Sequence, residues 1–300
     1  MRRRSDDGSF STGCYARAYV ELDSRASLVE KLMSRVLVTG GASGLGRAVA
    51  ERFARARARV CIVDLHDERG ASTVESLRRL GAQDAIYVRC DVTDESAIES
   101  VAQRLDDAWG GVDVVVNNAG VAQAGAIEDV SIDDWRWILD VNLLGVVRGC
   151  KIFTPRFKRQ KSGHFVNVAS MAGLLDVPMM SSYNATKAAV VSLSETLQHE
   201  LREHGIRVTV VCPSFFSTNL GESMRTPDPV LRAKMQKLLT RSTLTADDVA
   251  EDVFRAIQEK TFYVLPHREG RVAWALKRLL PRPAYAALAE RQMRAMRGAR

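Results

Sequence analysis

A glycine-rich segment between an apolar run and a helical pattern is the feature that most constrains the fold of this chain. The segment, TGGASGLG at residues 39–46, follows an apolar run at 36–38 that predicts a buried strand and precedes a pattern at 47–54 that predicts a helix. Glycines at 40, 44 and 46 permit a tight turn, close approach of a phosphate to the backbone, and close helix–strand packing. The start of the helix offers free N–H groups and a positive dipole end to an anion. The segment therefore predicts a pyrophosphate site at the end of a first strand.

An acidic residue follows at the spacing expected for a ribose-binding carboxylate. The next apolar run, residues 60–63, ends at Asp64, about twenty residues after the last glycine of the motif. A carboxylate there accepts hydrogen bonds from ribose hydroxyls and repels a 2′-phosphate, so it predicts NAD in preference to NADP. A glycine turn without a ligand is the alternative, and the strand, helix and acid around the motif argue against it.

Tyr183 and Lys187 are four residues apart, so they share one face of a helix. An ammonium group beside a phenol favours the phenolate and is expected to lower the tyrosine pKa from about 10. Ser170, earlier in the chain, is expected to hydrogen-bond the same reacting oxygen. Together the three side chains predict general acid–base catalysis.

These motifs resemble the short-chain dehydrogenase/reductase family from about residue 34 to residue 266. The matching motifs are the glycine-rich loop at 39–46, Cys90-Asp91-Val92, Asn117-Asn118-Ala119-Gly120, and the tetrad Asn142, Ser170, Tyr183 and Lys187. Pro213 and Thr218 match the ends of a Pro-Gly-x-x-x-Thr segment that holds the nicotinamide in the family. Ser214 stands where the family usually has glycine.

The resemblance implies an NAD(P)-dependent oxidoreductase that transfers a hydride between nicotinamide and an alcohol or ketone. It implies that Tyr183 is the general acid/base, that Lys187 stabilises the phenolate and bonds the nicotinamide ribose, that Ser170 holds the substrate oxygen, and that Asn142 positions a water. The cofactor-binding residues expected from the motifs and the resemblance are Thr39, Gly40, Ser43, Gly44, Leu45, Gly46, Asp64, Asp91, Val92, Asn118, Ala119, Gly120, Tyr183, Lys187, Pro213 and Thr218.

Other functions stay open at this point. One is an NADPH-dependent carbonyl reductase, which kinetics with both cofactors distinguish from an NAD enzyme. Another is a non-catalytic dinucleotide-sensing protein of the same fold, although such a protein often loses a catalytic residue and Ser170, Tyr183 and Lys187 are all present. A third alternative, a membrane-docked scaffold, is supported only by the basic C-terminal tail.

Apolar runs alternate with helical patterns through the body of the chain, which predicts an α/β fold with one Rossmann-type, doubly wound parallel sheet of about seven strands and helices on both faces. Strands are expected near 35–39, 59–64, 85–90, 112–117, 163–169, 206–212 and 261–265, and helices at 44–56, 67–80, 94–109, 131–160, 181–204 and 245–259. In this arrangement Thr39, Asp64, Asp91, Asn117 and Ser170 all lie at carboxyl ends of strands, where such folds bind ligands.

The catalytic domain is expected at 34–270, between two different terminal segments. Residues 1–33 are polar and carry no cofactor motif, so we expect a disordered leader or an over-extended start. The net charge of +7 is concentrated at the other end, since residues 271–300 hold eight basic residues and one acid. Apolar residues recur there at helical spacing, which predicts either peripheral contact with an anionic membrane or docking on the protein's own domain or subunit.

An irregular segment between Pro213 and Thr245 is expected to form a lid or binding loop. Phe215 and Phe216 on this loop, with Met179 and Met180 before the tyrosine, are expected to line a substrate pocket, although the two phenylalanines equally suit simple packing under the loop. These residues predict a largely apolar alcohol or ketone substrate.

The amino-acid composition limits which disulfides, metal sites, cellular locations and partners are expected. The five cysteines show no Cys-x-x-Cys spacing and the five histidines do not cluster, so we expect no disulfide frame and no metal site, and a reducing, cytoplasmic location. No aromatic reading motif accompanies the basic tail, which disfavours nucleic acid as a partner. The family resemblance implies a homodimer or homotetramer.

Overall fold

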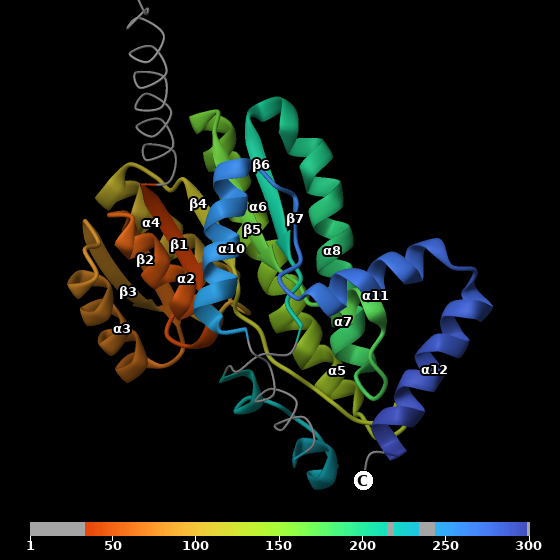
Figure 1. Cartoon of the computed structure of the whole chain (residues 1–300). Helices are drawn as coiled ribbons and strands as arrows, with labels where there is room; N and C mark the ends of the chain where they lie inside the picture. The colour runs from red at the N-terminus through yellow and green to blue at the C-terminus, as the bar shows by residue number, and fades with distance from the viewer. Residues whose placement is uncertain (1–33, 215–218, 234–243, 299–300) are drawn as a thin grey trace, which may run out of the picture.

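A seven-stranded, fully parallel sheet forms the centre of the computed structural model, which describes residues 34–214, 219–233 and 244–298 (Figure 1). The strands are β1 Arg35–Thr39, β2 Arg59–Asp64, β3 Asp84–Arg89, β4 Val114–Asn117, β5 Gly163–Val168, β6 Ile206–Val211 and β7 Tyr263–Val264. They lie in the order β3-β2-β1-β4-β5-β6-β7, so the chain changes direction across the sheet between β1 and β4. This confirms the expected doubly wound sheet and places a ligand crevice at the carboxyl ends of the central strands.

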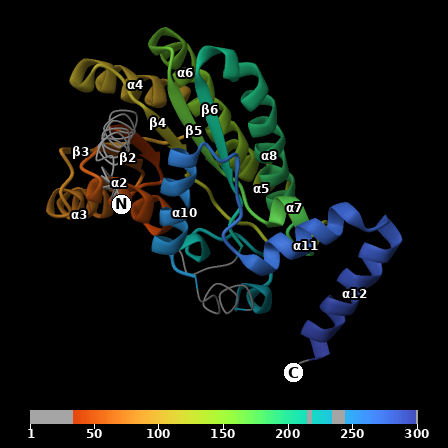
Figure 2. The same ribbon diagram turned by 45° about the horizontal axis from the view of Figure 1, so that its top comes forward.

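Helices cover both faces of the sheet. The α-helices of the described residues are α2 Gly44–Arg55, α3 Asp67–Arg79, α4 Glu95–Trp109, α5 Ile132–Leu139, α6 Gly145–Gln160, α7 Ala172–Leu175, α8 Ser181–Leu201, α10 Ala246–Glu259, α11 Arg268–Leu279 and α12 Arg282–Gly298. Helices α2, α3 and α10 lie on one face, and α4, α6 and α8 lie on the other (Figures 1 and 2).

The pleat of the strands divides the core into two halves. On β1, Val36 and Val38 pack with the α2 and α10 side of the core, whereas Leu37 between them packs with the α4, α6 and α8 side. Phe53 of α2 meets Phe254 of α10 edge to face, with ring centroids 5.2 Å apart. Because both faces of the strands are buried, the runs are continuously apolar rather than alternating.

Local signals in the sequence begin and end several helices. Asp94 caps α4 by accepting hydrogen bonds from the backbone N–H groups of Ser96 and Ala97. Gly110 ends the same helix in the left-handed conformation, with φ of 71°. Thr245 and Asp248 cap each other's backbone N–H groups at the start of α10.

The structure differs from the sequence prediction in one long helix. The expected helix at 131–160 is divided by a π-helical segment, Asp140–Leu144, between α5 and α6. The side chain of Asn142 in this segment forms hydrogen bonds with both the N–H and the C=O of Val121. Such local bulges are not readable from hydrophobic periodicity, and they occur frequently at functional sites. The expected strand at 261–265 is also shorter than predicted, because only Tyr263 and Val264 pair with β6.

The basic tail forms two helices, α11 and α12. Helix α11 begins before residue 271 and packs against α7, where Lys277 Nζ donates to the carbonyl of Leu174 at 2.7 Å and pairs with Asp176. Pro281 precedes α12, which lies apart from the sheet beyond α11 (Figure 2). Among the described residues, no helix is both long enough and apolar enough to cross a membrane.

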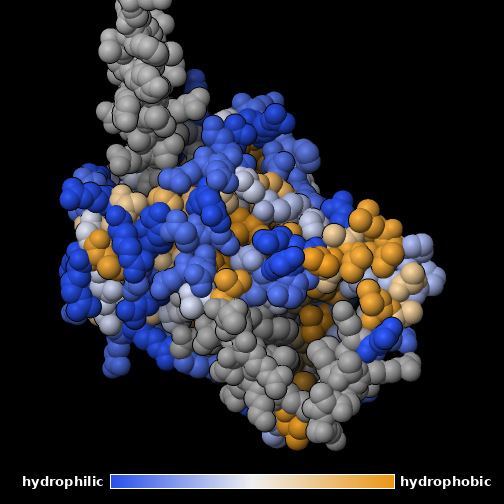
Figure 3. Space-filling view, in the orientation of Figure 1, coloured by the Kyte–Doolittle hydropathy of each residue, from blue (hydrophilic) through white to orange (hydrophobic). Residues whose placement is uncertain are grey.

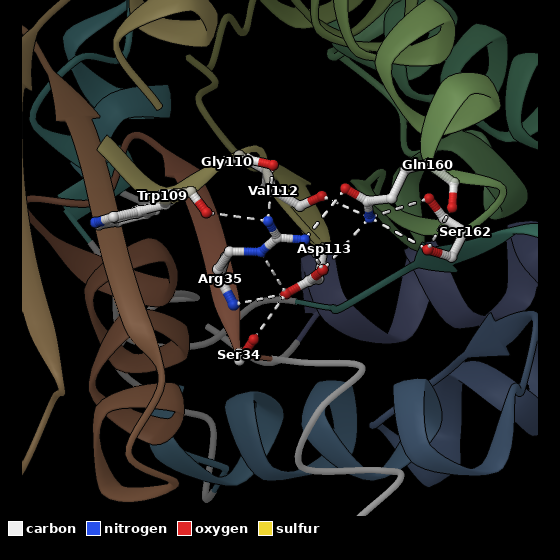
Figure 4. A network of polar contacts seen from close by, with 8 residues as sticks. All are labelled: Ser34, Arg35, Trp109, Gly110, Val112, Asp113, Gln160 and Ser162. Carbon is white, nitrogen blue, oxygen red and sulfur yellow. Dashed lines mark hydrogen bonds and ion pairs between the residues drawn. The ribbon is translucent and has the colours of Figure 1, made fainter. Parts of the chain in front are cut away.

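A polar network closes the edge of the sheet opposite the crevice (Figure 4). Asp113, before β4, accepts from the backbone N–H of Arg35 at 3.0 Å and from its guanidinium at 2.6 and 3.1 Å. Arg35 also donates to the carbonyls of Trp109 and Gly110, and Gln160 at the end of α6 joins the same group. The network therefore ties the start of β1 to the ends of α4 and α6.

We predict that Asp113→Ala destabilises the protein because it leaves the mostly buried Arg35 charge without its carboxylate. The expected loss in the free energy of unfolding is about 2–3 kcal/mol, measured by urea denaturation. Asp133→Ala removes a carboxylate that also pairs with an arginine but is 89% exposed, so it serves as the control and should change stability by less than about 0.5 kcal/mol. Equal effects of the two variants would contradict a structural role for the network.

Candidate active site

A cleft of about 850 Å³ lies at the carboxyl ends of the strands. Most of the residues expected from the sequence line it, namely Gly40, Ser43, Gly44, Leu45, Asp64, Asp91, Val92, Asn118, Ala119, Gly120, Ser170, Met180, Tyr183, Lys187 and Pro213. These residues come from segments spread over more than half of the chain, and the parallel register of the sheet brings them to one edge.

The glycine-rich loop is shaped by contacts that leave no room for side chains. A Cβ atom on Gly40, whose φ is 62°, would lie 2.9 Å from the Cα of Ala119. A Cβ atom on Gly46 would lie 2.2 Å from the carbonyl oxygen of Gly40. Ser43 precedes α2 without a side-chain hydrogen bond to the first turn, and that turn holds no acid. The loop therefore fits a pyrophosphate, which would meet backbone N–H groups rather than side chains.

Two of the expected cofactor residues act from behind the cleft instead of lining it. The hydroxyl of Thr39 accepts hydrogen bonds from the backbone N–H groups of Asn118 and Ala119, each at 3.0 Å. Gly46 packs the start of α2 against Gly40. Neither residue lines the cleft, and both position the glycine-rich loop through these contacts.

Asp64 lies where the ribose-binding carboxylate was expected. Its Oδ2 accepts from the N–H of Ala42 in the glycine-rich loop at 3.1 Å, and its Oδ1 accepts from the N–H groups of Leu65 and His66 at 2.8 and 3.2 Å. These bonds hold the carboxylate at the end of β2 beside the loop. The group is therefore placed to accept hydrogen bonds from a diol at this end of the cleft.

Two walls of the cleft are joined by an ion pair that the sequence did not predict. Arg69 on α3 contacts Glu222 at 2.9 Å, and both residues line the cavity. No local pattern connects residues so far apart in the sequence. Arg47, which follows the glycine-rich loop, pairs instead with Glu51 on its own helix at 2.8 Å.

Ser170, Tyr183 and Lys187 converge at the other end of the cleft. Tyr183 and Lys187 lie on the buried face of α8 and are only 7% and 4% exposed. The ammonium of Lys187 lies 5.8 Å from the centre of the Tyr183 ring and donates to the carbonyl of Val168 at 2.9 Å. Ser170, at the end of β5, donates to the carbonyl of Pro213 at 3.3 Å and accepts from the N–H of Ala172 at 3.1 Å.

Burial dominates the electrostatics of this group. It raises the pKa of Tyr183 to about 12, while the hydrogen bond with Ser170 acts in the opposite direction. Burial likewise lowers the pKa of Lys187 to about 8. The direction therefore differs from the lowered tyrosine pKa expected from the sequence, because the cost of burying a phenolate exceeds the opposing effect of the hydrogen bond with Ser170.

Asn142 lies behind the cleft and does not line it. Its Oδ1 accepts from the N–H of Val121 at 2.8 Å and its Nδ2 donates to the carbonyl of the same residue at 2.9 Å. A Cβ atom on Gly120 would lie 3.1 Å from Asn142 Oδ1 and 3.5 Å from Lys187 Nζ. Asn142 therefore holds the loop after β4, and a side chain on Gly120 would enter the space between Asn142 and Lys187.

The cleft beside Tyr183 has an apolar wall. Besides Met180, it contains Trp137, Leu175, Val177, Leu220 and Met224. Met179 is not among the residues that line the cleft, and its side chain is 41% exposed. Phe215, Phe216 and Thr218 lie outside the described residues.

Comparison with known proteins agrees with this geometry. A family model described as short chain dehydrogenase matches residues 34–229. The chain is 31% identical over 252 residues to the CLA biosynthesis dehydrogenase/reductase of Lactiplantibacillus plantarum. The matched region covers 78% of this chain and 88% of that protein. This protein belongs to the short-chain dehydrogenase/reductase family.

Solved structures of the family include complexes with both nicotinamide cofactors. A short-chain dehydrogenase/reductase from Burkholderia phymatum in complex with NAD is 35% identical, with a TM-score of 0.78 over 82% of this chain and 93% of that one. A short-chain dehydrogenase from Sphingobium yanoikuyae in complex with NADPH is 26% identical, with a TM-score of 0.68 over 88% of this chain and 95% of that one. The chain is thus a short-chain dehydrogenase/reductase oxidoreductase, and the fold accepts either nicotinamide dinucleotide.

One contact holds the backbone at the position where this short-chain dehydrogenase/reductase departs from the family pattern. Ser214 replaces the usual glycine, and its backbone N–H donates to Nδ1 of His267 at 3.1 Å. His267 is buried and directly precedes α11. It therefore fixes the backbone beside Pro213, a role that the sequence did not reveal because the two residues lie on separate segments.

We predict that the buried charge of Lys187 makes stability depend on pH. Between about pH 8 and about pH 10.5 the native lysine has lost its proton while the unfolded lysine still binds one, so stability rises with pH in this window. Relative to Lys187→Met, which cannot titrate, the wild-type protein should gain about 3 kcal/mol in the free energy of unfolding across it. Urea denaturation at both ends of the window measures the difference, with the exposed Lys158→Met as control. Parallel curves for wild type and Lys187→Met would show that the lysine titrates normally.

Proposed function

We propose that this protein is an NAD-dependent dehydrogenase/reductase that transfers a hydride between nicotinamide and a largely apolar alcohol or ketone. The observation that carries the proposal is the convergence of Ser170, Tyr183 and Lys187 at the apolar end of a cleft. The opposite end holds Asp64 and the glycine-rich loop. One cavity thus has a place for each half of a dinucleotide and for a substrate oxygen next to a proton donor.

The cofactor supplies or accepts the hydride, and the side chains handle the proton. During reduction, the neutral phenol of Tyr183 donates its proton to the carbonyl oxygen as negative charge develops there. The Ser170 hydroxyl donates a hydrogen bond to the same oxygen. The ammonium of Lys187, held by Val168, stabilises the phenolate that results. During oxidation the same groups act in the opposite order, and the phenolate removes the hydroxyl proton.

Asn142 is proposed to support this group from behind. The family resemblance implies that it positions a water linked to Lys187. Its contacts in this protein support a positioning role, because both polar atoms of its amide hold the backbone of Val121 next to Gly120. A shift of this loop would open the space around the lysine.

NAD is proposed as the cofactor on the basis of charge. The carboxylate of Asp64 repels a 2′-phosphate, whereas it accepts hydrogen bonds from a free diol. Arg47 and Arg69, which would attract such a phosphate, pair with Glu51 and Glu222. The local balance of charge therefore favours the cofactor without the extra phosphate.

The apolar wall supports a substrate that is largely hydrocarbon around its reacting carbon. Met180 and Met224 adapt to varied shapes, and Trp137 and Leu220 add further apolar surface. Binding in such a pocket disfavours polyols and sugars, because their hydroxyl groups would lose hydrogen bonds to water. A cytoplasmic location and assembly into a homodimer or homotetramer stay predictions from the sequence and the family.

Tyr183→Phe is expected to lower turnover by about 10²–10⁴-fold because it removes the proton donor. Turnover is followed through nicotinamide absorbance with a panel of hydrophobic secondary alcohols and ketones, set against polyols and sugars. Cofactor binding, measured by calorimetry, should be retained because the rest of the cleft is unchanged.

The control for this variant is Tyr263→Phe, which removes another phenolic hydroxyl, one bonded to Glu195 and absent from the cleft lining. It should keep wild-type turnover. Full activity of Tyr183→Phe would refute the proposed proton transfer, and a wild-type preference for the polar panel would refute the proposed substrate class.

Cofactor choice provides a second test. Wild-type kcat/KM should be at least about tenfold higher with NAD than with NADP, and Asp64→Asn should reduce that ratio by about tenfold because it removes the repelling charge. Asp67→Asn is the matched control, since it removes a carboxylate at the start of α3 that does not line the cleft. A clear preference of the wild-type protein for NADP would contradict the role given to Asp64.

A further inference from the structure

Helix α11 exposes an apolar stripe on the face that points away from the protein. Val272, Ala275 and Leu279 are spaced by three and four residues, so they share one side of the helix. Val272 is 52% exposed and Leu279 is 81% exposed. Figure 3 shows hydrophobic surface gathered over α11 at the right of the molecule. A stripe of this kind is typical of a surface that binds something apolar.

Basic side chains border the same stripe. Arg268, Arg271, Arg278 and Arg282 are all exposed, and none forms an ion pair with a carboxylate in the part of the chain that the structure describes. The guanidinium of Arg278 instead lies over the Trp274 ring at 4.9 Å, which leaves its charge uncompensated. The face therefore combines exposed hydrocarbon with positive charge.

The opposite side of α11 is already occupied by contacts with the protein. Gly270 sits against Met171, the residue after Ser170, so closely that a Cβ atom would lie 3.1 Å from its side chain. The Trp274 ring contacts Tyr263 at 5.1 Å, and Lys277 is bonded to Leu174 and Asp176. These contacts fix the orientation of the helix. The apolar stripe therefore stays exposed on the outer face of α11 in the described part of the chain.

The chemistry of this face selects its partner. A nucleic acid would satisfy the arginines but would leave the apolar stripe in water. A second copy of the chain, related by a two-fold axis, would bring the same arginines against one another, and Glu269 and Glu290 are the only acids between residues 268 and 291. An anionic bilayer offers hydrocarbon for the stripe and phosphate or carboxylate head groups for the arginines.

We propose that α11 docks this protein on the surface of an anionic lipid bilayer. Val272, Ala275 and Leu279 insert among the acyl chains, and the flanking arginines contact the head groups. The helix lies in the plane of the membrane rather than crossing it. Since its inner side touches Leu174 and Asp176, which flank the cleft-lining Leu175, docking places the apolar wall of the cleft close to the lipid.

The test uses the full-length protein and sedimentation with vesicles. Vesicles of phosphatidylcholine with about one third phosphatidylserine should bind the protein, and vesicles of phosphatidylcholine alone should bind it far more weakly. Binding should weaken as salt is added. Arg268→Gln/Arg278→Gln/Arg282→Gln should lower the partition coefficient on the order of 100-fold, since each basic residue near such a surface contributes about fivefold. Val272→Ser/Leu279→Ser should lower it by about tenfold or more.

Matched controls remove the same chemistry from other faces. Arg79→Gln/Lys158→Gln/Arg159→Gln loses three exposed positive charges, and Ile132→Ser loses an exposed apolar side chain. Both should bind vesicles nearly as well as the wild-type protein, and all variants should keep their thermal midpoint. Failure of the wild-type protein to bind anionic vesicles, or equal losses in the controls, would overturn the proposal. So would a dimer, seen by sedimentation velocity, that Val272→Ser/Leu279→Ser abolishes in the absence of vesicle binding.

Discussion

The hydrogen bonds between the loop after β1 and the loop after β4 are the contacts on which the rest of the site depends. Thr39 accepts from the N–H groups of Asn118 and Ala119, and the Asn118 amide donates to the carbonyls of Thr39 and Gly40 at 2.9 and 3.2 Å. They join the two strands at which the sheet changes direction. Because the loops approach so closely, Gly40 has no room for a side chain. The backbone that would receive a pyrophosphate is thus held rigidly before any ligand arrives.

The catalytic end of the cleft depends on a different balance, between burial and charge. Tyr183 and Lys187 are both removed from water, which raises the pKa of the phenol and lowers that of the ammonium. Each shift favours the neutral form, so the pKa values of the two groups, ordinarily close together, move apart to about 12 and about 8. The carbonyl of Val168 provides the hydrogen bond that makes a buried ammonium tolerable.

Helix α11 links this site to the surface of the molecule. Its inner side supports the segment that follows Ser170, through Gly270 against Met171 and Lys277 against Leu174. His267, just before the helix, holds the N–H of Ser214 on the other side of the cleft. The outer side carries arginines and exposed hydrocarbon. The same helix therefore braces the reaction site and presents the surface that we assign to lipid.

The sequence by itself determined the fold class and most of the residues around the cleft. Continuous apolar runs predicted buried parallel strands, and the spacing of glycines, Asp64, Tyr183 and Lys187 predicted which strand ends and which helix face carry the chemistry. These features depend on residues close together in the chain, so they can be recognised in the amino-acid sequence. The tertiary structure alone decided that Thr39, Gly46, Asn142 and Met179 do not line the cleft. It also decided that Arg69 pairs with Glu222 and that the N–H of Ser214 bonds to His267. The tertiary structure also raises the pKa of Tyr183, whereas the sequence predicted a lowered pKa. The cause is desolvation, which depends on how many atoms surround the phenol. That number is set by packing between segments far apart in the chain.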